Sequence, residues 1–212
     1  MYDRERSFSR RCGRWPDMDS SSVDKDRVRV LDAADALFYA HGVQAVGMDR
    51  IRDTAQVPLK RLYRAFPSKA ALVEAYLRRR DERARAALRA YTADRPTPEE
   101  RVLAVFDWLY EWYQQPEFRG CAFNNAFGEL GEDSESVAQA VAGHMTAIHD
   151  YLRVLTAEIT ASETLAGQLH ILISGATVLA AVHRTPEPAR QARTAAQALL
   201  TATTPAGAGS DR

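Results

Sequence analysis

The sequence has little cysteine and no long uninterrupted apolar segment. Its two cysteines, Cys12 and Cys121, form no CxxC pair, so nothing indicates a disulfide framework or a thiolate metal site. The longest apolar run covers residues 171–182 and is shorter than the roughly 20 residues that span a bilayer. The basic N-terminus lacks the apolar stretch of a secretory signal. We therefore expect a cytoplasmic protein with no membrane span.

Alternating strand patterns are also absent from the 212 residues, which carry 46% hydrophobic and 26% charged side chains. Alanine, the best helix former, is abundant, so the composition favours an all-α fold. The length fits one or two domains.

Motifs of common enzymes and metal sites are missing as well. There is no serine nucleophile elbow, HExxH pair, phosphate-binding glycine loop or dinucleotide fingerprint. His144 and His149 are five residues apart and His170 belongs to another predicted helix, which is poor spacing for zinc. We expect no enzyme activity, no cofactor and no metal.

The zero net charge conceals an uneven distribution. Residues 24–80 carry twelve basic and seven acidic side chains, whereas residues 81–212 carry eleven and seventeen. A basic segment joined to an acidic one is compatible with chance, but it also suggests that the basic segment binds nucleic acid.

Helical periodicity starts at Val30 and predicts a first helix from about Lys25 to Ala40, closed by Gly42. Two short helices follow, at residues 48–55 and 59–65, and together they form a helix-turn-helix. The second helix of such a unit enters the major groove of DNA. Its predicted inward residues are Leu62 and Phe66.

Residues 29–77 resemble the DNA-binding domain of TetR-family transcriptional repressors. The stretch ends in the signature LYxxFxSKxxL, carried by Leu62, Tyr63, Phe66, Ser68, Lys69 and Leu72. The resemblance implies that Tyr63 and Lys69 bind phosphates and that residues 58–64 face the operator bases. The expected DNA-binding residues are Met48, Arg50, Pro58, Leu59, Lys60, Arg61, Tyr63, Arg64 and Lys69.

Five positions depart from the family pattern. Gly47, Gln56, Pro58, Lys60 and Ala65 stand where the family usually has threonine, glycine, serine, a small residue and histidine. Proline is tolerated at a helix start, where its missing N–H has no partner to lose. The operator sequence therefore does not follow from the resemblance.

A long helix from Ser68 to about Tyr91 is expected to connect the DNA-binding domain to a ligand domain. Its Arg78, Arg79 and Arg80 are interpreted first as a solvated face. The next helix, residues 98–114, begins with a capping box at Thr97.

Five aromatic residues within residues 106–113 are more than one core-facing stripe holds, so some of them are candidates for a ligand pocket rather than for packing alone. Arg119, Gly120 and Cys121 begin a segment that resembles the RGCxxxN segment of many TetR-family ligand domains. Glu111 or Glu129 could select a cationic ligand. The predicted pocket residues are Phe106, Trp108, Trp112, Tyr113, Phe123, Asn124, Met145, His149 and His170.

Three further helices are predicted, from near Ser134 to Ile159, at residues 162–183 and at residues 186–201. The second of these is apolar nearly all round, whereas a surface helix of a monomer has a polar face. In the family that the sequence resembles, the last two helices pair with their copies across a dimer interface. We expect a homodimer, with interface residues Leu172, Gly175, Leu179, Ala196 and Leu199.

The resulting domain plan has four parts. Residues 1–23 are expected to be a disordered basic arm, with Met18 as an alternative start, and residues 205–212 a disordered tail. Residues 24–72 are the DNA-binding domain and residues 73–204 the ligand-binding and dimerisation domain. The arm could add DNA contacts, or it could be absent in the cell.

The sequence thus predicts a DNA-binding transcriptional regulator with double-stranded DNA and a small-molecule effector as partners. A repressor is favoured, binding a palindromic operator as a homodimer and released by its ligand. An activator without a small-molecule response is the alternative, and a helical enzyme a remote one.

Overall fold

The computed structural model describes residues 20–161 and 163–203, and within these ranges it contains nine helices and no strand. The all-α prediction is confirmed. Residues 1–19 of the predicted arm and the whole predicted tail lie outside these residues, whereas residues 20–23 belong to the first helix, so the prediction of disorder is wrong for them. The helices are α1 (Ser20–His41), α2 (Met48–Ala55), α3 (Leu59–Ala65), α4 (Lys69–Ala93), α5 (Pro98–Tyr113), α6 (Ala122–Leu130), α7 (Glu135–Thr156), α8 (Thr164–His183) and α9 (Glu187–Thr203).

Capping residues start α4 and α5 where the sequence predicted. Ser68 Oγ accepts a hydrogen bond from the Ala71 N–H at 3.1 Å and so begins α4. Thr97 and Glu100 form a reciprocal capping box at the start of α5, with hydrogen bonds of 3.2 and 3.3 Å. These side chains satisfy backbone N–H groups that have no partner within the helix, so they fix each start locally.

Two hydrophobic cores organise the chain. One joins α1–α3 and the first part of α4 to α6 and the start of α7, and the other joins α5, α8, α9 and the rest of α7. Val73 and Phe123 both lie in the first core. The predicted domain boundary at residue 72 therefore falls inside a continuous core, because α6 packs on the DNA-binding helices.

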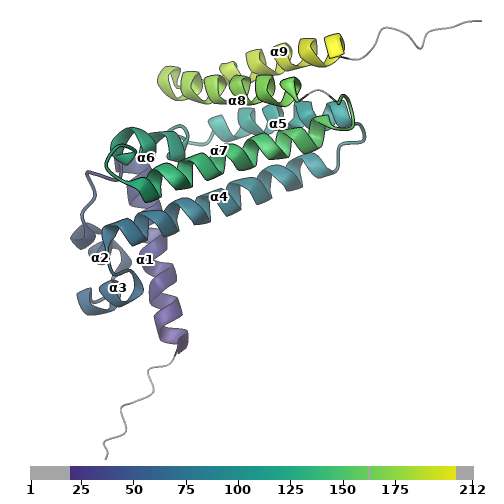
Figure 1. Cartoon of the computed structure of the whole chain (residues 1–212). Coiled ribbons are helices and arrows are strands. Elements are labelled where there is room, and N and C mark those ends of the chain that lie inside the picture. Colours follow the sequence, from purple (N-terminus) through teal and green to yellow (C-terminus); the bar gives the residue numbers. More distant parts are fainter. Residues whose placement is uncertain (1–19, 162, 204–212) are drawn as a thin grey trace, which may run out of the picture.

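Long helices separate the two ends of the molecule (Figure 1). The helices α1, α2 and α3, called the head below, lie at one end, and α8 and α9 pack together at the other. The intervening helices α4, α5 and α7 run between these ends.

The turn after α1 depends on Gly42, whose φ is +87°. The Gly42 N–H donates to the Phe38 carbonyl at 2.9 Å and ends the helix there. A Cβ at this position would lie 3.0 Å from Glu129 Oε1 of α6. The Glu129 carboxylate also accepts a hydrogen bond from the Gln44 N–H at 2.7 Å, so the turn is part of the contact between the head and α6.

We predict that Gly42→Ala lowers the free energy of unfolding by about 1–2 kcal/mol, because alanine disfavours the left-handed backbone. The effect is measured by urea unfolding. Gly143→Ala in α7 is the control: its Cβ meets nothing within 4 Å, and alanine in a helix interior should stabilise by about 0.5–1 kcal/mol. Equal effects of the two substitutions would contradict this account of Gly42.

Candidate nucleic-acid interface and ligand cavity

The short helix α3 is built to present one face to a partner. Leu62 and Ala65 are buried in the head core, while Leu59 and Tyr63 are about 43% and 45% exposed. Lys60 is also exposed. Pro58 is the N-cap residue with φ −57°, which is the helix-compatible value that proline imposes.

The helix α1 holds α3 and the turn before it through three polar contacts. Arg29 donates to the Gln56 carbonyl before α3 at 3.3 Å, and Arg27 donates to the Ala65 carbonyl at its end at 2.8 Å. Between them, Arg61 of α3 forms an ion pair with the buried carboxylate of Asp26. The orientation of α3 is therefore determined by polar contacts as well as by the core.

Several residues predicted to bind DNA already have partners in the protein. Arg61 is engaged by Asp26, and Arg50 hydrogen-bonds His41 Nε2 at 2.9 Å. Met48 is partly buried against the head core. Lys69 donates to the Gln44 carbonyl at 3.3 Å.

The α3 residues Leu59, Lys60 and Tyr63 remain the most direct candidates for contact with a nucleic acid. Their exposed side chains share a single helix with Arg64, which is exposed as well. This surface combines positive charge with an aromatic hydroxyl, which suits phosphates and base edges.

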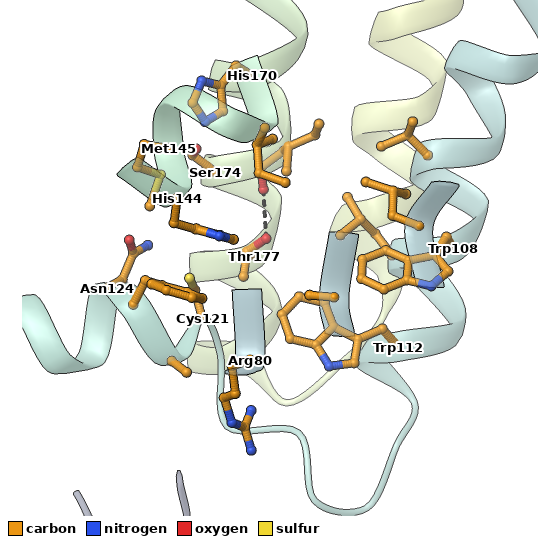
Figure 2. A pocket seen from close by; sticks show the side chains of 18 of the residues that line it. Arg80, Trp108, Trp112, Cys121, Asn124, His144, Met145, His170, Ser174 and Thr177 are labelled. Atoms are coloured by element: carbon orange, nitrogen blue, oxygen red, sulfur yellow. Dashed lines mark hydrogen bonds between the residues drawn. The ribbon is translucent and has the colours of Figure 1, made fainter. Parts of the chain in front are cut away.

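A cavity of about 390 Å³ lies between α4, α5, α6, α7 and α8, within the usual range for small-molecule sites of about 300–1,000 Å³. In Figure 2, Trp108 and Trp112 form one side, and Cys121, Asn124, His144 and Met145 face them. The lining is mostly apolar and aromatic, with a few polar groups. Arg80 and His170 lie at opposite ends.

Residues 30–76 match the family model described as bacterial regulatory proteins of the tetR family, and residues 98–196 match the one described as the tetracyclin repressor-like C-terminal domain. A solved TetR-family transcriptional regulator from Streptomyces coelicolor is 31% identical, with a TM-score of 0.79, covering 86% of this chain and 97% of that one. The chain belongs to the TetR family. The predicted resemblance is confirmed.

Two curated regulators match part of this TetR-family chain. The transcriptional repressor KstR of Rhodococcus jostii is 40% identical over 67 residues, which cover 32% of each chain. The transcriptional activator FasR of Mycolicibacterium smegmatis is 38% identical over 90 residues, which cover 41% of each. The matches thus span about a third to two fifths of the relatives' length. All these proteins are named as regulators, in agreement with the prediction that the chain is not an enzyme.

Six of the nine predicted pocket residues line the cavity of this TetR-family protein, and three do not. Phe106 is fully buried in the second core, and Tyr113 packs in the same core with its hydroxyl 2.6 Å from Thr177 Oγ1. His149 lies near His170 but outside the lining. The aromatic run of α5 is therefore divided between core and cavity. The residues that line it as predicted are Trp108, Trp112, Phe123, Asn124, Met145 and His170.

The cavity also contains residues that the sequence did not reveal as pocket residues. Arg80 and Arg83 come from α4, Asp35 from α1 and Cys121 from the loop before α6. The sequence feature that could have indicated Arg80 and Arg83 as pocket residues is their position on the helix that links the two domains. A helical period alone did not show which of its sides faced the cavity.

Neither of the two glutamates proposed to select a cation lines the cavity. Glu111 accepts a hydrogen bond from the Tyr91 hydroxyl at 2.6 Å, and Glu129 binds the Gln44 backbone. Neither glutamate is therefore placed to select a cationic ligand in this cavity, because both carboxylates belong to other contacts.

His144 forms a buried polar contact in the cavity wall. Its ring stacks on Phe123 with centroids 3.7 Å apart, and Nδ1 lies 2.7 Å from an Asp81 carboxylate oxygen. Burial lowers the pKa of His144, and Asp81 opposes this only in part because Arg85 also pairs with it. The pKa of His170 is lowered by burial and by the nearby His149. Both changes favour neutral imidazoles.

An exposed apolar stripe follows one face of α8. Ile171 and Val182 are 73% and 69% exposed, and Val178 and Leu179 lie between them on the same face. Of the predicted interface residues, Gly175 and Leu179 are exposed on this face. Leu172 and Leu199 pack partly against the second core, and Ala196 is fully buried. The assignment of Ala196 to the interface is wrong, because α9 turns that residue inward.

The helix α8 is also long and apolar enough, by length and composition, to cross a membrane. Core helices of soluble proteins pass the same test, and TetR-family regulators are soluble. Among residues 20–161 and 163–203, no group of three His, Cys, Asp or Glu side chains could hold a metal.

We predict that the free energy of unfolding falls as the pH drops below about 6.5. Unfolded histidine takes up a proton near that pH, whereas the lowered folded pKa of His144 and His170 resists protonation, so the unfolded state gains protons first. The loss is at most about 1.4 kcal/mol per pH unit for each histidine. Urea unfolding at pH 7.5 and 5.5 measures it.

The matched variants are His144→Gln and His183→Gln. Removing the buried His144 should reduce the dependence on pH, whereas His183 is exposed at the end of α8 and its removal should leave the dependence unchanged. An undiminished pH dependence in His144→Gln would refute the assignment.

Proposed function

We propose that the protein is a transcriptional repressor that binds a palindromic operator as a homodimer and is released by a small molecule in the cavity. The observation that carries the proposal is the exposed face of α3, with Leu59, Lys60 and Tyr63. Polar contacts from α1 hold this helix and the turn before it. A rigidly held, basic recognition helix can enter the major groove without first being ordered.

The apolar stripe of α8 supports the homodimer. It lies at the end opposite the head (Figure 1), so pairing through α8 and α9 leaves both heads accessible. One short helix contacts only a few base pairs, and specificity therefore requires two heads on a symmetric site. A two-fold axis through the stripe would bury the same residues from both protomers.

The helix α4 supports regulation by ligand. It begins at the head, and four residues of its middle part line the cavity: Arg80, Arg83, Ala84 and Leu88. If α4 can take two placements, a molecule that binds the cavity more tightly in one of them favours that placement. The distance between the two heads would then change. Repression relieved by ligand needs the ligand to favour the form that does not bind DNA.

The first test is selection of the purified protein on random duplex DNA at physiological salt, followed by sequencing of the bound fraction. Enrichment of a palindrome with two half-sites is the expected result. Salt-sensitive binding without any enriched sequence would contradict an operator-binding function. A ligand that strengthens DNA binding would favour an activator, the role named for FasR of M. smegmatis.

We predict that Lys60→Ala weakens binding to the selected operator and lowers the slope of log K against log salt by about 1, because one phosphate contact is lost. Arg78→Ala is the control, since it removes one positive charge from the exposed side of α4, where Arg78 pairs only loosely with Glu74 at 3.8 Å. Binding is measured by fluorescence anisotropy at several salt concentrations. Identical slopes for the two variants would exclude a phosphate contact at Lys60.

We predict that Val182→Glu weakens the homodimer at least about tenfold, because a charge would be buried in the α8 interface without a partner. Val154→Glu is the matched control: Val154 is 66% exposed near the end of α7, as Val182 is 69% exposed near the end of α8. Analytical ultracentrifugation gives the dissociation constants. Equal effects, or a wild-type protein that is monomeric, would overturn the proposed interface.

A further inference from the structure

One end of the cavity is formed by arginines of α4 that share a carboxylate of α1. Arg80 donates through Nε to Asp35 at 2.5 Å, and Arg83 lies 3.7 Å from the same carboxylate. Arg79 also approaches Asp35 at 3.3 Å, but its main partner is Asp32 at 2.7 Å. Three guanidinium groups therefore compete for Asp35.

The charged side chains at this end of the cavity carry a net positive charge. The charged side chains that line the cavity in the described part of the chain are Arg80, Arg83 and Asp35, which leaves one excess positive charge. Arg83 is 63% exposed, and its one ion pair within residues 20–161 and 163–203 is the long contact to Asp35. Arg80 lies over the Tyr39 ring, 3.8 Å from its centroid, which fixes the plane of its guanidinium. A planar, oriented guanidinium is well suited to a carboxylate.

The rest of the cavity does not supply a competing charge. Trp108 and Trp112 make one wall apolar, and at the far end the environment of His170 favours the neutral ring. The cavity therefore has an apolar body with a positive end near α1, as Figure 2 shows for Arg80 below Trp112 and Cys121.

We propose that the effector is an apolar molecule with one anionic group, and that this group pairs with Arg80 and Arg83 in place of Asp35. The proposal rests on the proposed function, because it names the chemical class of the ligand of that cavity. A cation is disfavoured by the excess positive charge, and a neutral molecule gains no attraction from it.

The same exchange connects the ligand to the head. Asp35 belongs to α1, the helix whose Asp26, Arg27 and Arg29 hold α3 in position. When the anion takes Arg80, Asp35 keeps only the weaker contact with Arg79, while Arg79 stays bonded to Asp32 and to the Leu31 carbonyl. The contact between α1 and α4 is thus loosened at one point and retained one turn away, which permits a pivot of the head.

The test compares three probes with the same chain: decanoate, decanol and decylamine. Binding to the full-length protein is measured by isothermal titration calorimetry without DNA. Decanoate should bind at least about tenfold more tightly than decanol, because it gains charge-assisted hydrogen bonds, and decylamine should bind least.

Variants locate the anion at the arginine end. Arg83→Ala should remove most of the advantage of decanoate over decanol, whereas Arg78→Ala, the control on the outer side of α4, should not. Asp35→Asn should strengthen decanoate binding about two- to fivefold without affecting decanol, because the competing carboxylate is gone. Circular dichroism verifies that each variant is folded, and Arg83 is exposed enough for its removal to be tolerated.

Equal binding of the three probes, tighter binding of decylamine, or no binding of any probe would overturn the proposal. So would an advantage of decanoate that persists in Arg83→Ala. None of these outcomes affects the result of the operator selection. The experiments therefore distinguish a wrong ligand class from a wrong DNA-binding function.

Discussion

The ion pairs between α1 and α4 are the contact on which the rest of the arrangement depends. Asp35, Arg79 and Arg80 are only 17%, 14% and 25% exposed, so breaking a pair among them would leave a charge poorly solvated, whereas Asp32 is 56% exposed. The same α1 carries Asp26, which anchors α3. A single helix therefore contacts both α4 and α3 through charged side chains, so the two helices are connected through α1.

A second connection runs through α6 and explains why the molecule does not divide cleanly into two domains. Phe123 of α6 packs in the head core and also lines the cavity, and Glu129 at the other end of α6 binds Gln44 next to the head. On α1, Tyr39 donates to the Gly120 carbonyl at 2.9 Å just before α6 begins. The cavity wall and the head thus share side chains. Because protein interiors are close-packed, a displacement of these side chains in the cavity wall requires the head core to repack.

The helices themselves could be predicted well, whereas the residues of the cavity could be predicted only in part. Ser68, Thr97 and Ser134 cap helices by contacts within three residues, so their effect is visible in the sequence. Trp108 and Phe106 lie two residues apart on α5, yet one lines the cavity and the other is fully buried. The aromatic composition indicated a pocket, but which aromatic residues line it and which are buried in the core depended on how α7, α8 and α9 cover α5.

The sequence by itself determined the all-α class, the helix-turn-helix, most helix ends and the TetR-family resemblance, because each of these depends on neighbours along the chain. The tertiary structure alone decided which charges pair and which apolar faces stay exposed. Arg79 and Arg80 have the composition of a solvated face but bind α1, while Ile171 and Val182 have the composition of a core but lie in the open. Helical periodicity tells which residues share a face, and only packing tells what covers it.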